Sequence, residues 1–97
     1  MKEQQKITTS KMPGETMQQY TAWQLYCLTG SFDRLLVTWQ GLLQGYTKIT
    51  PELDSLRNRL GRMVTRKTIA LWSKKFSWVK RTELKITEDV DHQNSHL

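Results

Sequence analysis

The stretch from Ser55 to Thr82 combines an apolar rhythm of helical spacing with charge of a single sign. Its bulky apolar residues recur at helical spacing. They are Leu56, Leu60, Ile69, Trp72, Phe76 and Trp78. A surface that only has to be soluble mixes both signs of charge, but here no acidic residue accompanies the basic ones. The nine basic residues are Arg57, Arg59, Arg62, Arg66, Lys67, Lys74, Lys75, Lys80 and Arg81. The pattern predicts folded helices that face a polyanion, and nucleic acid is the first candidate.

Length and composition limit the fold to one small domain. The chain has 97 residues, of which 37% are hydrophobic, enough for a core of three or four helices. The net charge of +6 favours nucleic acid or an anionic membrane surface over acidic small molecules as a partner. Cys27 is the single cysteine, which excludes an internal disulfide and a cysteine-based zinc site and suits a reducing compartment. No apolar run is long enough for a membrane span, and the N-terminus lacks the apolar core of a signal peptide, so we expect a cytoplasmic protein.

The sequence divides into three segments. Residues 1–14 are polar and end in Pro-Gly, which predicts a flexible N-terminal arm. Residues 15–82 hold the apolar periodicity and are expected to form the helical domain. Residues 83–97 are acidic and polar, with too few apolar residues to order themselves, so we expect a disordered tail.

Turn and capping signals inside residues 15–82 predict four helices. The first begins near Glu15 or Thr16, buries a stripe that includes Trp23 and Cys27, and ends at Gly30. The second runs from an N-cap at Ser31 to Gly45 with Phe32, Leu35, Leu36, Trp39, Leu42 and Leu43 on its apolar side. The third starts at Thr50-Pro51-Glu52 and stops at Gly61. The fourth is capped by Thr65 and continues to about Ser77 or beyond. The prediction is therefore an all-α bundle of about four helices.

The last two of these helices have the layout of a helix-turn-helix. Ile69, Trp72 and Phe76 share the inner face of the second helix, and small or basic residues occupy the outer arc. Ala70 is small enough to let the backbone approach a groove, and Arg66 and Lys67 lie on the first turn, where such proteins most often reach base edges. The expected DNA-binding residues are Arg57, Arg59, Arg62, Thr65, Arg66, Lys67, Ala70, Lys74 and Lys75.

Two runs of sequence resemble a known family. Residues 64–72, VTRKTIALW, are similar to the V-S-x-x-T-V-x-x-W run of many bacterial and phage helix-turn-helix proteins. Residues 73–81, SKKFSWVKR, extend this toward the ending of phage terminase small-subunit-like DNA-binding domains, and residues 20–30 resemble their opening. The resemblance implies a phage-derived protein of the bacterial cytoplasm that binds double-stranded DNA. It leaves the large terminase subunit or another phage protein, and a homo-oligomer, as possible partners. One departure is a connection of three residues between Leu60 and Val64 where the usual pattern has one.

Other interpretations stay open at this stage. A transcriptional regulator of phage or prophage genes fits the same residues, and so does a non-enzymatic interaction module that docks an acidic partner, with Leu71 and Trp78 as anchors. Trp78 could pack in the core, contact a second copy or stack on a base. His92 and His96 have metal-ligand spacing but no third ligand. The pattern of a catalytic site is missing, so we expect neither an enzyme nor a cofactor or bound metal.

Overall fold

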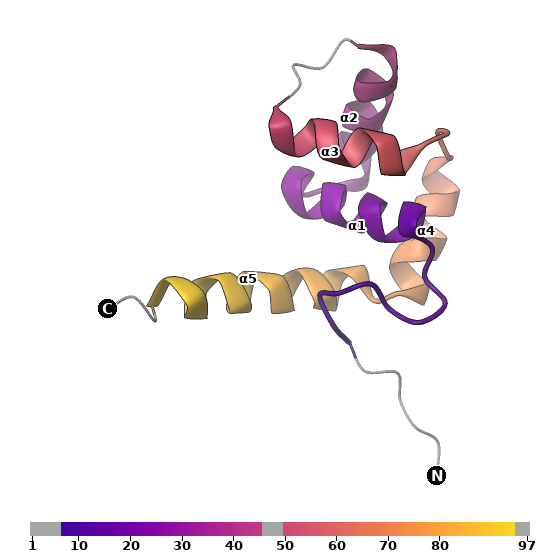
Figure 1. The fold of residues 1–97 in the computed structure, drawn as a ribbon. Helices are drawn as coiled ribbons and strands as arrows, with labels where there is room; N and C mark the ends of the chain where they lie inside the picture. The colour runs from indigo at the N-terminus through magenta and orange to yellow at the C-terminus, as the bar shows by residue number, and fades with distance from the viewer. Residues whose placement is uncertain (1–6, 46–49, 95–97) are drawn as a thin grey trace.

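The computed structural model describes residues 7–45 and 50–94, with side chains up to residue 90. Within these ranges the chain forms helices and no strand (Figure 1), which confirms the all-α fold class. The helices are α1 (Met17–Thr29), α2 (Phe32–Gln44), α3 (Pro51–Leu60), α4 (Arg66–Lys75) and α5 (Trp78–Asn94). There are thus five where about four were expected. Residues 1–6, 46–49 and 95–97, which include His96, lie outside the described part, and predictions about them remain predictions.

The first four helices begin at the residues that capping signals indicate. At α1 the Thr16 hydroxyl accepts a hydrogen bond from the Gln19 backbone N–H at 3.1 Å, and the Gln19 side chain accepts one from the Thr16 N–H at 2.8 Å. Such a reciprocal box satisfies two of the free N–H groups at a helix start. The caps of the next three helices, each bonded to the third helical N–H, are Ser31, Thr50 and Thr65. Gly30 ends α1 in the left-handed region at a φ of 86°, which a glycine adopts without strain.

Helix α1 lies at the centre of the molecule and packs on α2 and α3. Trp23 and Leu25 are both buried, although they point to different sides of the helix. A helix with neighbours on several sides buries more than one stripe. The single predicted stripe of α1 was therefore too narrow, and Met17 and Leu28, expected near it, are about half exposed.

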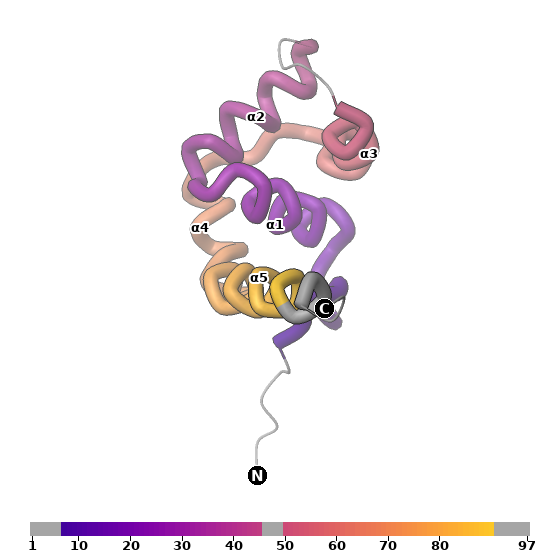
Figure 2. The backbone as a smooth tube through the Cα atoms, turned by 90° about the vertical axis from the view of Figure 1, so that its left-hand side faces the viewer, coloured from indigo at the N-terminus to yellow at the C-terminus, as the bar shows by residue number. Residues whose placement is uncertain are grey.

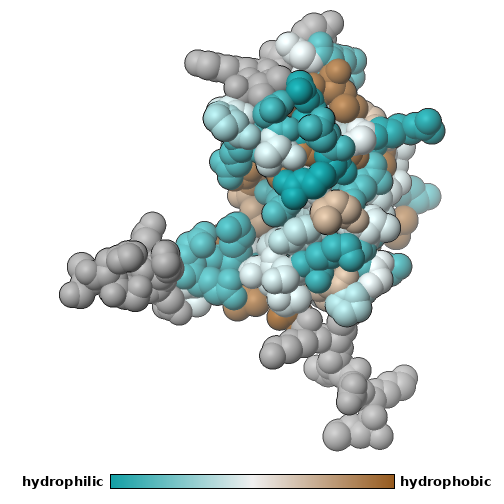
Figure 3. All heavy atoms as spheres, viewed as in Figure 1, coloured by the Kyte–Doolittle hydropathy of each residue, from teal (hydrophilic) through white to brown (hydrophobic). Residues whose placement is uncertain are grey.

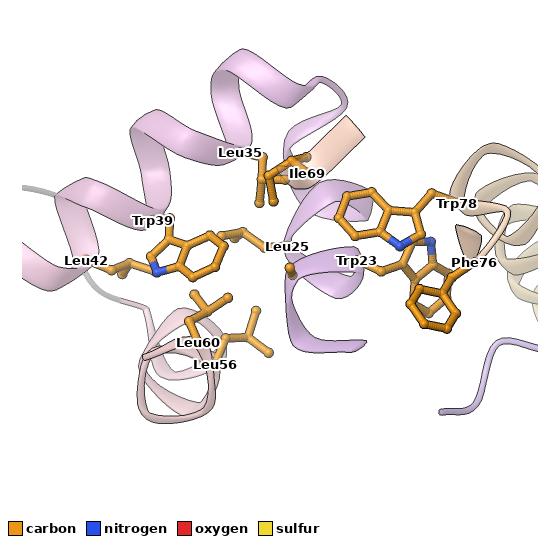
Figure 4. Close-up of a cluster of buried hydrophobic side chains, with 11 residues drawn as sticks. Trp23, Leu25, Leu35, Trp39, Leu42, Leu56, Leu60, Ile69, Phe76 and Trp78 are labelled. Carbon is orange, nitrogen blue, oxygen red and sulfur yellow. The ribbon is translucent and has the colours of Figure 1, made fainter. Parts of the chain in front are cut away.

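The core runs along α1 and has an aromatic residue at each end (Figure 4). At one end Trp39 of α2 lies close to Leu56 and Leu60 of α3. At the other end Trp23 gathers with Phe76 and Trp78, where α4 meets α5. The buried side chains of these two groups and the region between them are Ala22, Trp23, Leu25, Leu35, Trp39, Leu42, Leu56, Leu60, Ile69, Phe76 and Trp78. Aromatic side chains supply much of this volume, as a small domain requires.

The N-terminal arm was wrongly predicted for the residues that the structure describes. Residues 7–14 lie against the body, and Met12 is only 2% exposed. The Tyr20 hydroxyl donates to the Thr9 carbonyl at 3.0 Å, and Arg81 donates to the carbonyls of Thr8 and Ser10 at 2.8 and 3.0 Å. Hydrogen bonds to groups far along the chain hold this segment in place, so its polar composition does not leave it free.

The predicted disordered tail was also wrong up to Asn94, because α5 continues through it. Figures 1 and 2 show α5 crossing below α1 and extending beyond the body of the molecule. Its first turn is anchored by buried Trp78 and Arg81, and a helix that has already been nucleated grows at little cost per residue. An i,i+4 pair of Lys85 and Asp89 at 3.6 Å supports the exposed turns. None of the described helices is long and apolar enough to cross a membrane.

Candidate nucleic-acid interface

The connection between α3 and α4 is held in place by one side chain of α1 and one of α2. The Gln18 side-chain amide donates to the carbonyls of Leu60 and Arg62, at 2.7 and 3.1 Å. The Trp39 indole N–H donates to the Gly61 carbonyl at 3.0 Å. These bonds fix the point at which α4 starts. The sequence predicted no role for Gln18 and only core packing for Trp39. Nothing in the neighbouring sequence of either residue indicates a hydrogen bond to the α3–α4 connection.

Helix α4 has the two faces that its sequence predicts. Ile69 and Phe76 are buried and Trp72 is half-buried against the core. Helix α4 packs against α2 and α5, and Figure 2 shows it running from the level of α2 down to α5. The exposed residues on the outer arc are Arg66, Lys67, Ala70, Leu71, Lys74 and Lys75. The small Ala70 and the lysines therefore share a solvent-facing surface of a helix whose opposite side is buried.

The lysines of α4 are the accessible charges of the predicted site. In the described parts of the chain, Lys67 and Lys74 form no salt bridge. The ammonium of Lys75 lies 5.4 Å from the centre of the Phe76 ring, a contact that leaves its charge unneutralised. Lys67 and Lys74 are seven residues apart, two helical turns, so they flank Ala70 on the same face. We call Lys67, Ala70, Lys74 and Lys75 the α4 basic face.

Arg66 is exposed but points toward α2. Its Nε donates to Asp33 Oδ1 at 2.9 Å, and its guanidinium lies 5.7 Å from the Phe32 ring. Both partners of the ion pair are mostly exposed, at 63% for Arg66 and 77% for Asp33, so water screens their attraction. Arg66 could exchange Asp33 for a phosphate at little cost. Asp33 lies in the first turn of α2, where its charge also favours the helix dipole.

Of the three predicted arginines that precede α4, the two on α3 bind residues of their own helix. Arg57 is bound to Asp54 at 2.7 Å and is half-buried. Arg59 folds back onto Ser55, to the carbonyl at 3.3 Å and the hydroxyl at 3.4 Å, and lines a groove next to Lys85 of α5. Residues two positions apart point to opposite sides of a helix, so Arg57 and Arg59 cannot serve one surface. Arg62, in the connection that leads to α4, is exposed.

Arg81 belongs to the core and not to a charged surface. Its guanidinium is fully buried and forms a two-point ion pair with Glu15, at 2.8 and 3.2 Å. It also lies 4.3 Å from the centre of the Trp23 ring. Counting it among the charges that face a polyanion was therefore wrong. The count failed because its partner is 66 residues earlier in the chain, where sequence patterns show no link.

Trp78 also turns inward, because the helix breaks before it. Ser77 has a φ of 54°, a left-handed conformation that stops α4 and restarts the chain as α5. The expectation of one continuous helix put Trp78 on the outer side, near Leu71. The break separates them: Trp78 is fully buried, with its ring centre 5.5 Å from that of Tyr26, whereas Leu71 is 60% exposed. Of the three roles considered for Trp78, the structure supports packing.

The remaining candidates for reactive or metal-binding groups are few. Burial raises the pKa of the Cys27 thiol above its usual value, although the Thr82 hydroxyl at 3.7 Å partly opposes this. A raised pKa keeps the thiol protonated and unreactive. No cluster of three His, Cys, Asp or Glu side chains that could hold a metal occurs among the described residues. The side chain of His92 is outside that set.

Comparisons of the chain with protein-family models, curated proteins and solved structures gave no match. The features of the chain that bear on its function are therefore the α4 basic face and the motif of residues 64–81.

Proposed function

We propose that the protein binds double-stranded DNA through the α4 basic face, with α3 and α4 as the two helices of a helix-turn-helix and with α2 and α5 packed against α4. The observation that carries this proposal is the combination on α4 of a buried inner side and an outer side with exposed lysines that have no carboxylate partner among the described residues. Such a face costs electrostatic self-repulsion, and a polyanion relieves it. The width of the major groove admits one α-helix.

The mechanism divides the residues by what they can reach. Lys67 and Lys74 would straddle Ala70 in the groove, where a lysine can donate to guanine acceptors and a methyl group can contact thymine. Lys75 of the face, together with Arg62 and Lys80, which are exposed before and after α4 in the chain, would contact phosphates, which gives affinity and register without sequence information. Arg66 joins them if it leaves Asp33. Arg59 contributes little, because it lines the groove on the side of α5.

The biological setting follows from resemblance alone. The similarity of residues 64–81 to small-terminase-like domains supports a role in recognising phage DNA for packaging, with the large terminase subunit as a partner in the cytoplasm of a bacterial host. Control of phage or prophage transcription uses the same interface. The two roles differ in the DNA site selected, and selection from a random duplex library followed by mapping to phage genomes would distinguish them.

The direct test is titration of a fluorescent random duplex at several salt concentrations. With about five phosphate contacts, log affinity should fall against log salt with a slope of about −4 to −5. Lys67→Ala and Lys74→Ala should each weaken binding and reduce the slope by about one. Lys85→Ala is the matched control, because this lysine lines a groove with residues of α1 and α3 and is paired with Asp89, so its loss should leave binding unchanged.

The rival function is docking of an acidic protein on the same face. One observation favours it: Leu71 is 60% exposed between the lysines, and an apolar side chain of this kind can anchor a protein partner. Duplex titration decides between the two. Failure to bind any duplex at low salt rejects the DNA proposal, and Leu71 would then be the residue to probe.

A further inference from the structure

Helix α5 carries an apolar stripe that is about half exposed in the described part of the chain. Val79, Ile86 and Val90 are 56%, 58% and 46% exposed. Their spacings of seven and four residues put the three on one side of the helix. Figure 3 shows apolar surface along the lower edge of α5 where it leaves the body. We call these three side chains the α5 stripe.

A groove beside this stripe extends the apolar surface onto α1. It has a volume of about 300 Å³ and is lined by Cys27, Leu28, Thr82 and Ile86, with the charged residues Glu52, Lys85 and Asp89 also in its wall. Leu28 is 48% exposed, although Leu25, one turn earlier in α1, is fully buried. Ile86 therefore borders both the stripe and the groove, and the two form one continuous surface.

The outer half of α5 also lacks the packing that usually keeps a helix formed. After Arg81 none of its described residues is buried. Thr82 accepts a hydrogen bond from the Trp23 indole N–H at 3.1 Å, and farther along the helix Glu88 accepts one from the Thr9 hydroxyl at 3.0 Å. Isolated helices of this length are marginal in water, and most helices in proteins depend on a packed apolar face. A partner on the α5 stripe would supply that face.

Charge along α5 indicates what the partner is. The first half carries exposed Lys80 and half-buried Lys85 and one acid, Glu83, whereas residues 86–94 contain three acids and no basic residue. Two copies of α5 placed antiparallel bring the acidic half of each next to the more basic half of the other. Their helix dipoles then also oppose each other favourably. A parallel pair would place like charges side by side.

We propose that a second copy of this chain docks on the α5 stripe, with the two α5 helices antiparallel about a two-fold axis. Val79 of each copy then lies near Val90 of the other, and Ile86 is close to the centre. Such an interface is self-complementary and closes after two copies. It involves no residue of the α4 basic face and does not depend on the proposed DNA binding.

Sedimentation equilibrium of the full chain over a range of micromolar concentrations tests the association. The wild type should be a dimer at the upper end, and Ile86→Lys should raise the dissociation constant at least about tenfold, since each copy loses the burial of an isoleucine. Val37→Lys is the matched control: Val37 is an aliphatic residue of α2, 71% exposed and away from α5, and its change should leave the constant unaltered. A monomeric wild type at all concentrations, or equal effects of both variants, overturns the proposal.

Disulfide cross-linking tests the orientation. In a Cys27→Ser background, Val79→Cys and Val90→Cys chains mixed under oxidising conditions should form a cross-linked heterodimer. Val79→Cys alone should not, because the two copies of this residue lie at opposite ends of an antiparallel pair. Efficient cross-linking of Val79→Cys with itself would show a parallel or different contact and overturn the proposal. Circular dichroism of each variant confirms that the helices remain folded.

Discussion

Replacing Arg81 should destabilise the protein more than any surface change. The guanidinium is fully buried, bonded twice to Glu15 and once each to the carbonyls of Thr8 and Ser10. Arg81→Met keeps an unbranched side chain over the Trp23 ring but leaves the Glu15 carboxylate without its cation and the two carbonyls without a donor. Breaking a buried pair by removing one partner costs about 3–5 kcal/mol. For a domain whose whole stability is about 5–15 kcal/mol, this is a large fraction.

Urea denaturation followed by tryptophan fluorescence measures this loss. Because Arg81→Met alone can leave too little folded protein, the series includes Glu15→Gln and the double variant Glu15→Leu with Arg81→Met. The double variant should be more stable than the sum of the single losses predicts, since neither charge is then left buried alone. Trypsin cleavage after Lys11 gives a local readout and should become faster in Arg81→Met, as Thr8 and Ser10 lose their donor. A loss below about 1 kcal/mol, within the range of an exposed pair, would refute the reasoning.

Three further predictions concern single residues. Ser77→Gly should stabilise the fold by about 0.5–1 kcal/mol in thermal melts, because its positive φ costs a serine more than a glycine, whereas Ser77→Val should destabilise it; equal melting temperatures for all three would show that the turn is unstrained. Lys67→Ala should weaken binding to a selected duplex by about 1–3 kcal/mol more than to a scrambled one, whereas Arg59→Ala should change neither, and equal losses for Lys67→Ala on both duplexes would mean that α4 does not read bases. Iodoacetamide should modify Cys27 more slowly than free cysteine near neutral pH and faster as the pH rises, since a raised pKa leaves less thiolate; modification at the rate of free cysteine would contradict this.

The sequence by itself determined where most helices begin and end. The caps at Thr16, Ser31, Thr50 and Thr65 each bond to a backbone N–H three residues away, so the cause and its effect lie within one turn. The sequence also determined the inner and outer faces of α4, because helical periodicity alone places Ile69 and Phe76 on one side. The exposure of the lysines on the opposite side is a consequence of that geometry.

Only the tertiary structure decided which basic residues are available and how far the ordered chain extends. The partner of Arg81 is Glu15 and the partner of Arg66 is Asp33, at separations of 66 and 33 residues, and no local pattern connects them. The same contact with Arg81 holds residues 8–15 and anchors the first turn of α5, so two segments that look disordered by composition order each other. The left-handed turn at Ser77, where no glycine marks it, moved Trp78 into the core. A prediction of which side a residue faces assumes an unbroken helix, so it fails after such a break. Burial depends on the whole fold.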